Sequence, residues 1–191
     1  GVETDQVSVA DRGFTYGDGL FETIAVRSGQ CRFLTAHLQR LTHGCERLRI
    51  PMPAIGLLEK QLDEAMGGCA NGTLKLVLTR GTGARGYMPP AKARPTCAIG
   101  FAEEAVVHSS LDGIRARYCQ TTISRNPVLA GMKTLNRLEQ GLARAEWTAA
   151  GIVEGLMLND RNEVVCGTMS NLFVVANDGL LTPALDEAGV I

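Results

Sequence analysis

The stretch Asn126–Trp147, NPVLAGMKTLNRLEQGLARAEW, places one lysine between two kinds of sequence pattern. After Lys133, a row of apolar residues recurs at spacings of three and four: Leu135, Leu138, Leu142 and Ala145. This spacing predicts an amphipathic helix that starts directly after Lys133 and packs that face inward. Before it, Pro127 and Gly131 resist helix formation, so we expect the chain to leave a strand over 117–123 and turn irregularly. A lone lysine is ordinarily a solvated surface residue, but this pattern predicts a lysine held where a strand gives way to a helix.

Three further stretches accompany this one in chain order: ADRGFTYGDGLFET at 10–23, HLQRL at 37–41 and GTMSNLF at 167–173. Together with LAGMKTLNRLEQ they resemble the fold type IV pyridoxal-phosphate enzymes, a group that includes branched-chain and D-amino acid aminotransferases and the aminodeoxychorismate lyases. The lysine segment is most similar to that of the lyases. The resemblance covers nearly the whole chain and implies an α+β fold of two domains, with pyridoxal 5'-phosphate bound covalently to Lys133.

Composition limits the possible classes of protein. The chain has 191 residues, 45% of them hydrophobic, which is enough to bury a core in one large or two small domains. The formal net charge is −1 with both signs interspersed, so nucleic acid is not an expected partner. No apolar run approaches the roughly 18 residues of a membrane span and no signal peptide is visible. We therefore expect a cytoplasmic protein with no membrane partner.

The cysteines and histidines predict no metal site. The six cysteines are widely scattered without a C-x-x-C pair, and the three histidines lack the spacing of zinc ligands. Reduced thiols in a cytosolic protein are the simplest interpretation of this pattern.

The polar, unpatterned run EEAVVHSSLDG predicts a domain linker. We accordingly expect an N-terminal α+β domain over 1–104, a linker over 105–112 and a C-terminal domain over 113–191 that carries the cofactor lysine. By resemblance, the second domain continues for several dozen residues beyond Ile191, so it is expected to be truncated here. The family also implies a homodimer.

Two aromatic residues near the start are candidates for the substrate pocket. Phe21, Thr23 and Ala25 alternate with Glu22, Ile24 and Val26, which predicts a half-buried strand in which the two sets point in opposite directions. By resemblance, Tyr16 and Phe21 form the aromatic wall of the substrate pocket. An ordinary core position is an equally good interpretation for Phe21.

The loop RGTGARGYMPPAKARP lies between two predicted strands and is long enough to suggest a function. Its glycines match the dinucleotide fingerprint G-x-G-x-x-G formally, but the prolines that follow Tyr87 forbid the helix that this fingerprint requires. By resemblance, Arg85 holds a substrate carboxylate with Tyr87 beside it. The alternative is a solvated loop arginine.

The cofactor phosphate needs positive charge and N–H groups. Arg40 lies off the buried stripe of a predicted helix and by composition would be solvated, but by resemblance its guanidinium anchors the phosphate. Thr168, Met169 and Ser170 would add hydroxyl and amide donors. The family's remaining phosphate contacts fall beyond the end of this chain.

One position departs from the family pattern. Family members usually carry a glutamate before the glycine of GTMSN, where it pairs with the pyridinium nitrogen; here that position is Cys166. A neutral thiol gives a weaker electron sink than a carboxylate. Aminotransfer depends heavily on that sink, and an elimination that creates an aromatic ring depends on it less. Glu163 lies three residues earlier and does not obviously substitute.

Three functions remain open from the sequence. The first is a 4-amino-4-deoxychorismate lyase of folate biosynthesis, in which Lys133 binds the cofactor and then serves as the base that removes a substrate proton. Pyruvate would leave and 4-aminobenzoate would form from the small-molecule substrate. The alternatives are a D-amino acid or branched-chain aminotransferase of the same fold, and a catalytically weak cofactor-binding protein.

Overall fold

The computed structural model describes residues 4–104, 113–177 and 179–185 of the chain. These residues fall into two compact units. The first comprises 4–104 together with Met132–Leu135, and the second comprises 113–131 together with 136–185. The predicted linker over 105–112 lies outside the described residues.

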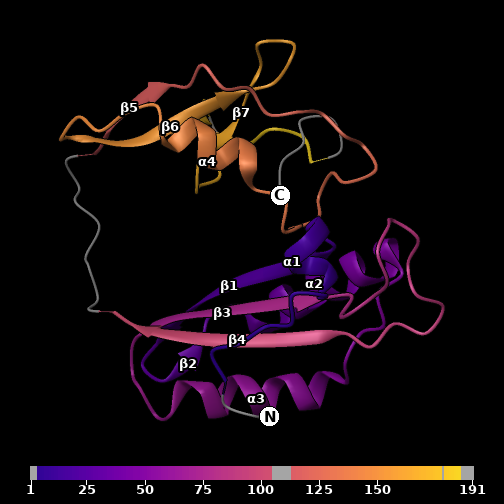
Figure 1. Cartoon of the computed structure of the whole chain (residues 1–191). Coiled ribbons are helices and arrows are strands. Elements are labelled where there is room, and N and C mark those ends of the chain that lie inside the picture. The colour runs from indigo at the N-terminus through magenta and orange to yellow at the C-terminus, as the bar shows by residue number, and fades with distance from the viewer. Residues whose placement is uncertain (1–3, 105–112, 178, 186–191) are drawn as a thin grey trace. The chain divides into compact units, whose positions relative to one another are not determined.

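The first unit is built on a four-stranded antiparallel sheet with the strand order β2-β1-β3-β4 (Figure 1). Its elements are α1 (Arg12–Tyr16), β1 (Gly19–Arg27), β2 (Gln30–Cys31), α2 (Leu34–Leu48), α3 (Ile55–Met66), β3 (Gly72–Thr79) and β4 (Thr96–Glu103). Helix α2 packs on β1, and α3 packs on β3 and β4.

Alternation along the strands gives the sheet two different faces, as the sequence predicts. Ile24, Leu74 and Leu76 point to the helices and have no solvent exposure. The opposite face includes Thr23 and Lys75, which are exposed and are paired across β1 and β3. The core of the first unit therefore lies between the sheet and the two long helices.

The second unit contains a three-stranded sheet of order β5-β6-β7 and a separate hairpin, β8-β9. Strands β5 and β6 are parallel, and β6 and β7 are antiparallel. The elements are β5 (Arg115–Tyr118), α4 (Leu138–Arg144), β6 (Ile152–Leu158), β7 (Val164–Gly167), β8 (Val174–Ala176) and β9 (Gly179–Leu181). The buried cluster of this unit consists of Cys119, Ile123, Ala143, Trp147, Met157, Val165 and Cys166.

The lysine segment differs from its predicted structure. The sequence predicts a helix directly after Lys133, whereas α4 begins at Leu138. The preceding residues Met132–Leu135 belong to the first unit and not to the domain over 113–191, because their backbone pairs with β1. A residue whose amide and carbonyl bond to a neighbouring strand cannot also join a helix.

The boundaries and packing of the neighbouring elements also differ from the prediction. The strand expected over 117–123 is β5, which is shorter and begins two residues earlier, at Arg115. Helix α4 buries Ala143, while Leu138 and Leu142, which were expected to face inward, are exposed. The leucine spacing predicted the helix correctly but gave the wrong buried face.

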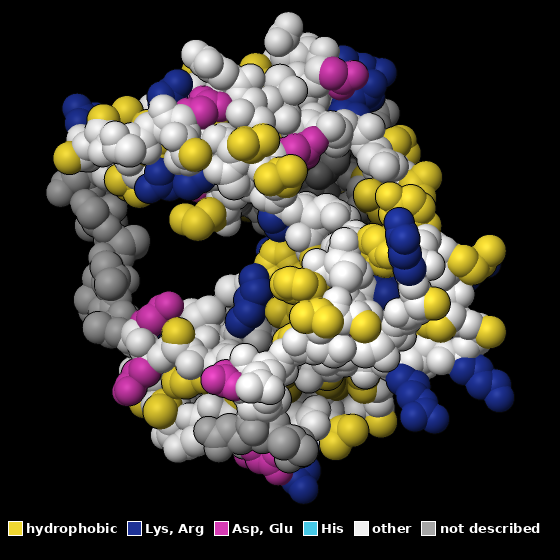
Figure 2. Space-filling model, in the orientation of Figure 1, with side chains coloured by type: hydrophobic (Ala, Val, Ile, Leu, Met, Phe, Trp, Pro, Cys, Tyr) yellow, Lys and Arg dark blue, Asp and Glu magenta, His cyan; other side chains and the backbone are white. Residues whose placement is uncertain are grey.

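Apolar side chains reach the surface in both units (Figure 2). Tyr87 and Met88 are consecutive exposed residues of the loop that joins β3 to β4, so this loop presents an apolar tip to solvent. Within the part of the chain that the structure describes, no helix combines the length and the apolar character needed to cross a membrane.

The packing of α3 gives a direct test of the first unit. Leu58 is fully buried and its neighbour Leu57 is 51% exposed on the same helix. We expect Leu58→Ala to lower the free energy of unfolding by about 2–5 kcal/mol, because it leaves a cavity. The matched variant Leu57→Ala should change it by less than about 1 kcal/mol. Urea titration followed by circular dichroism measures both, and equal losses would contradict the described packing.

Candidate active site

Lys133 is held by backbone pairing to the edge of β1. The Phe21 amide donates to the Lys133 carbonyl at 2.9 Å, and the Leu135 amide donates to the Gly19 carbonyl at 3.0 Å. Strand β2 pairs only with the far end of β1, so the lysine segment occupies the part of the edge that β2 leaves open. A side chain on Gly19 would come within 2.8 Å of Leu135 and 2.6 Å of a β3 carbonyl, so this approach requires glycine.

The pairing register fixes the face on which the lysine lies. Because Leu20 pairs with Thr134, Lys133 lies beside Phe21 on the sheet face away from the helices. The Lys133 ammonium is 4.6 Å from the centre of the buried Phe21 ring, and the Lys75 ammonium is 3.7 Å from the same centre. Phe21 is therefore a contact of the lysine and not only a core residue, and two cations share its ring.

The guanidinium of Arg40 is fixed by a buried carboxylate that sequence reasoning did not identify as a site residue. Glu22, 1% exposed, accepts from Arg40 Nε at 2.7 Å and from Arg40 Nη2 at 2.5 Å. His37 Nδ1 lies 2.7 Å from the same carboxylate. The hydrogen bonds with Glu22 raise the pKa of Arg40, so the guanidinium is cationic at any physiological pH. It is also partly exposed, which suits an anion anchor.

Arg40 and Lys133 contact consecutive residues of β1, Glu22 and Phe21. Glu22 holds Arg40 on the helix-covered face, and Phe21 contacts Lys133 on the opposite face. Both cations belong to the first unit. An amine and a fixed guanidinium are the groups that an aldehyde and a phosphate require, so these residues fit pyridoxal phosphate chemically. Their binding of one cofactor remains a prediction.

In the second unit, the residues expected to bind phosphate surround an internal carboxylate. Glu154 on β6 is 8% exposed and accepts hydrogen bonds from the Thr168 amide at 2.9 Å and from the Thr168 hydroxyl at 2.5 Å. Its second oxygen accepts from the Ser170 hydroxyl at 2.8 Å and from the Met169 amide at 3.4 Å. The donors of the GTMSN segment are thus turned toward Glu154, and phosphate binding by them remains a prediction.

Glu154 is charged in this setting. Burial raises the pKa of its carboxyl group, but hydrogen bonds from the side chains of Thr168 and Ser170 and from the amides of Gly155 and Thr168 outweigh burial, and the net pKa is lowered. The carboxylate also explains Gly167, where a side chain would come within 2.8 Å of it. Glu154 therefore determines the shape of the segment that follows β7.

Cys166, at the position of the family glutamate, lies in the apolar cluster of the second unit. Burial raises the pKa of its thiol to about 11, although the positive charge of Arg137 acts in the opposite direction. The side chain is therefore a neutral thiol near neutral pH, as we expected from the sequence.

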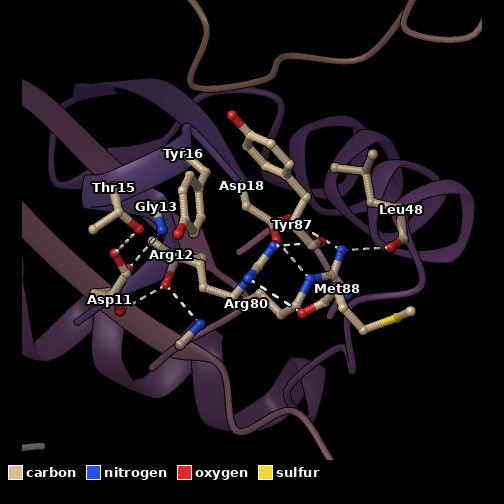
Figure 3. A network of polar contacts seen from close by, with 12 residues as sticks. Asp11, Arg12, Gly13, Thr15, Tyr16, Asp18, Leu48, Arg80, Tyr87 and Met88 are labelled. Atoms are coloured by element: carbon tan, nitrogen blue, oxygen red, sulfur yellow. Dashed lines mark hydrogen bonds and ion pairs between the residues drawn. The ribbon is translucent and has the colours of Figure 1, made fainter. Parts of the chain in front are cut away.

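The remaining predicted residues lie near the glycine-rich loop of the first unit (Figure 3). The ring centres of Tyr16 and Tyr87 are 5.4 Å apart, and the Tyr16 hydroxyl accepts from the Gly86 amide at 2.9 Å. Arg85 is exposed on the same loop. The structure thus brings Tyr16 of α1 against the loop that carries Arg85 and Tyr87, and it places Phe21 separately, beside Lys133.

Comparisons with known proteins show the fold and the family of this chain. The solved 4-amino-4-deoxychorismate lyase of Pseudomonas aeruginosa superposes with a TM-score of 0.91 and 45% identity, covering 98% of this chain and 70% of that one. The fold is thus a fold type IV fold, as predicted. The amino-transferase class IV family matches residues 19–191, and the chain belongs to this family. The cofactor of the family is pyridoxal phosphate, which confirms the predicted cofactor.

Curated relatives include both expected activities. The aminodeoxychorismate lyase of Vibrio harveyi is 35% identical over 195 residues, covering 100% of this chain and 71% of the relative. A putative branched-chain-amino-acid aminotransferase of Methanocaldococcus jannaschii is 34% identical over 192 residues, covering 96% of this chain and 65% of the relative. The relatives of this chain therefore include both lyases and aminotransferases.

The Glu154 cluster predicts a pH-dependent contribution to stability. Because the folded-state pKa is lowered, the contribution is present above the unfolded-state pKa and is lost as the pH falls through the folded-state value. We expect Glu154→Gln to lower the free energy of unfolding at pH 7 by about 1–3 kcal/mol, with the difference from the native protein shrinking below about pH 4. Urea titrations at several pH values measure this difference.

Glu163→Gln is the matched control for this prediction. Its carboxylate is exposed and accepts from Asn159 at 2.6 Å. Glutamine keeps an acceptor for this bond, so the substitution should cost less than about 1 kcal/mol. A larger loss in Glu163→Gln than in Glu154→Gln would show that the buried cluster is not the stabilising one.

Proposed function

We propose that the protein is a 4-amino-4-deoxychorismate lyase, which eliminates pyruvate from its substrate to give 4-aminobenzoate for folate biosynthesis. The observation that carries the proposal is the likeness to the Pseudomonas aeruginosa lyase, with 45% identity and a TM-score of 0.91 over 98% of this chain. The position of Lys133 on the edge of β1 supports it further, because an amine held by backbone pairing is pre-oriented for covalent chemistry.

Lys133 has two roles in this reaction. Its amine would hold pyridoxal phosphate through the cofactor's aldehyde, and as a free amine it would take the proton from the substrate carbon that carries the amino group. When bound, pyridoxal phosphate supplies an electron sink for this carbon. Loss of this proton and of the neighbouring enolpyruvyl group, which leaves as enolpyruvate and takes up a proton to become pyruvate, makes the substrate ring aromatic. The reaction therefore needs no base besides Lys133.

Other residues bind and orient the cofactor and the substrate. Arg40, held by Glu22, anchors the cofactor phosphate, and the face of Phe21 beside Lys133 packs against the reacting part of the substrate. Arg85 pairs with a substrate carboxylate, with Tyr87 beside it. The proposed partners are a small molecule and a second copy of this chain, in the cytoplasm.

A specific observation supports an aminotransferase as the second candidate, since the Methanocaldococcus jannaschii relative is 34% identical. Cys166 argues against it, because a neutral buried thiol cannot hold a proton on the pyridinium nitrogen as a carboxylate does. The same thiol supports the third candidate, a catalytically weak cofactor-binding protein.

The proposed activity predicts pyruvate release without a keto-acid acceptor. We expect purified protein loaded with pyridoxal phosphate to release pyruvate from aminodeoxychorismate, whereas an aminotransferase would be inert until a keto acid was added. Lys133→Ala should reduce release by about 10³-fold or more, because it removes anchor and base together. Lys60→Met, at an exposed lysine of α3, is the control and should keep full activity. Borohydride reduction and peptide mapping should find the cofactor on Lys133.

Cys166 provides a second test. We expect Cys166→Glu to raise aminotransfer to an added keto acid by about tenfold or more while changing pyruvate release less, because the carboxylate strengthens the electron sink. Cys166→Gln has a similar shape without the charge and is the matched control. If neither the native protein nor Cys166→Glu releases pyruvate, the weak cofactor-binding protein is the better interpretation.

A further inference from the structure

The loop that carries Arg85 and Tyr87 wraps around one buried guanidinium (Figure 3). Arg12 is 3% exposed and belongs to α1, far from the loop in sequence. Its Nη1 donates to the Gly86 carbonyl at 2.9 Å and to the Met88 carbonyl at 3.4 Å, and its Nη2 donates to the Tyr87 carbonyl at 3.0 Å. Three successive carbonyls of the loop therefore converge on a single cation.

The guanidinium is itself fixed by Asp18. Arg12 Nε donates to an Asp18 oxygen at 2.8 Å, and Arg80 donates to both oxygens of the same carboxylate at 2.7 and 3.0 Å. Burial raises the pKa of Asp18, but hydrogen bonds from Arg80 and Arg12 outweigh burial and lower it. Asp18 is thus ionised and compensates part of the buried positive charge.

Arg80 shares Asp18 with Arg12 but serves a different part of the unit. Its remaining donors bond to the carbonyls of Leu48 and Arg49, at the end of α2. Both arginines are almost fully buried. Arg80 therefore offers a matched comparison, because it has the same charge and the same carboxylate partner. In the described part of the chain its side chain bonds to the Leu48 and Arg49 carbonyls and not to those of the loop.

Tyr16 supports the loop from a second direction. Its hydroxyl accepts from the Gly86 amide, and its ring lies 4.9 Å from the Arg12 guanidinium carbon and 5.4 Å from the Tyr87 ring. Gly86 has φ +107°, which a residue with a side chain rarely adopts. Gly86 thus turns its amide to Tyr16 and its carbonyl to Arg12, so the backbone is held on both sides just where Tyr87 begins.

A guanidinium suits this role and an ammonium does not. Its donors form a rigid planar fork that can reach a carboxylate and several carbonyls at the same time. A lysine at the same place would keep the charge beside Asp18, but its compact ammonium could not reach all three carbonyls. The carbonyl dipoles would then face one another without a cation, which disfavours the observed loop conformation.

We propose that Arg12 is a positioning residue that holds the loop of Arg85 and Tyr87 in its substrate-binding conformation. The role in substrate binding rests on the proposed function, whereas the restraint of the loop does not. A purely structural Arg12 would neutralise Asp18 and do nothing further. Lysine would then replace it, so the conservative variant separates the two roles.

Trypsin cleavage after Arg85 measures the restraint without any enzymatic activity. Arg85 is exposed, so slow cleavage in the native protein must come from the conformation of the loop. We expect Arg12→Lys to be cut between Arg85 and Gly86 at least about tenfold faster than the native protein, and Arg80→Lys to be cut at that bond at nearly the native rate. Mass spectrometry of the fragments identifies the bond.

Equal cleavage of Arg12→Lys and the native protein would overturn the proposal, as would equally fast cleavage of both variants. If Arg12→Lys does not fold, trypsin cleavage of the native protein tests the proposal instead. A clamped loop is cut after Arg85 far more slowly in the folded protein than in the unfolded protein, and similar rates in the two states would overturn the proposal.

Steady-state kinetics tests the consequence for the substrate. For pyruvate release from aminodeoxychorismate, we expect Arg12→Lys to raise KM about tenfold and to change kcat by less than about threefold, because a loosened loop weakens binding and leaves Lys133 in place. A loss in kcat with KM unchanged would contradict the positioning role. If the native protein releases no pyruvate, the proposed function fails, while the cleavage experiment still decides the restraint by Arg12.

Discussion

The pairing of the lysine segment with the edge of β1 is the interaction on which the site depends. Two backbone hydrogen bonds, one on each side of the Leu20–Thr134 pair, hold the segment extended. Because side chains alternate along an extended chain, the pairing puts Lys133 on the Phe21 face and Thr134 on the helix face. The position of the Lys133 amine is thus set by the backbone, and a register shift of one residue would turn it into the core.

A buried carboxylate organises the polar groups of each unit. Glu22 fixes Arg40 and His37 in the first unit, and Glu154 fixes the segment from Thr168 to Ser170 in the second. A buried charge is tolerated only when its oxygens are hydrogen-bonded. Each carboxylate therefore prescribes where its donors lie. The first holds a cation partly open to solvent, and the second draws its donors inward, so the two units differ in what they offer an anion.

Local patterns in the sequence predicted what depends on neighbours along the chain, and long-range pairing determined the rest. Alternation in β1 predicted correctly that Phe21 and Glu22 point to opposite faces of the sheet, and it put Glu22 in the same row as Ile24. A glutamate in an apolar row was the available signal for a buried ion pair. The predicted start of the helix was too early because the leucine spacing after Lys133 is typical of a helix. The backbone there instead pairs with the edge of β1, so α4 begins only at Leu138.

The glycine-rich loop shows why its dinucleotide-like spacing does not imply a phosphate site. In a phosphate-binding loop the glycines let backbone amides face an anion. Here the carbonyls of Gly86, Tyr87 and Met88 face the cation of Arg12, so the polarity of the loop is reversed. A side chain on Gly83 would come within 3.0 Å of the Arg12 Cδ, so a larger residue there would crowd the stem of the arginine. A loop that turns these carbonyls inward around a cation is poorly suited to cradle a phosphate, because the carbonyl dipoles would repel the anion.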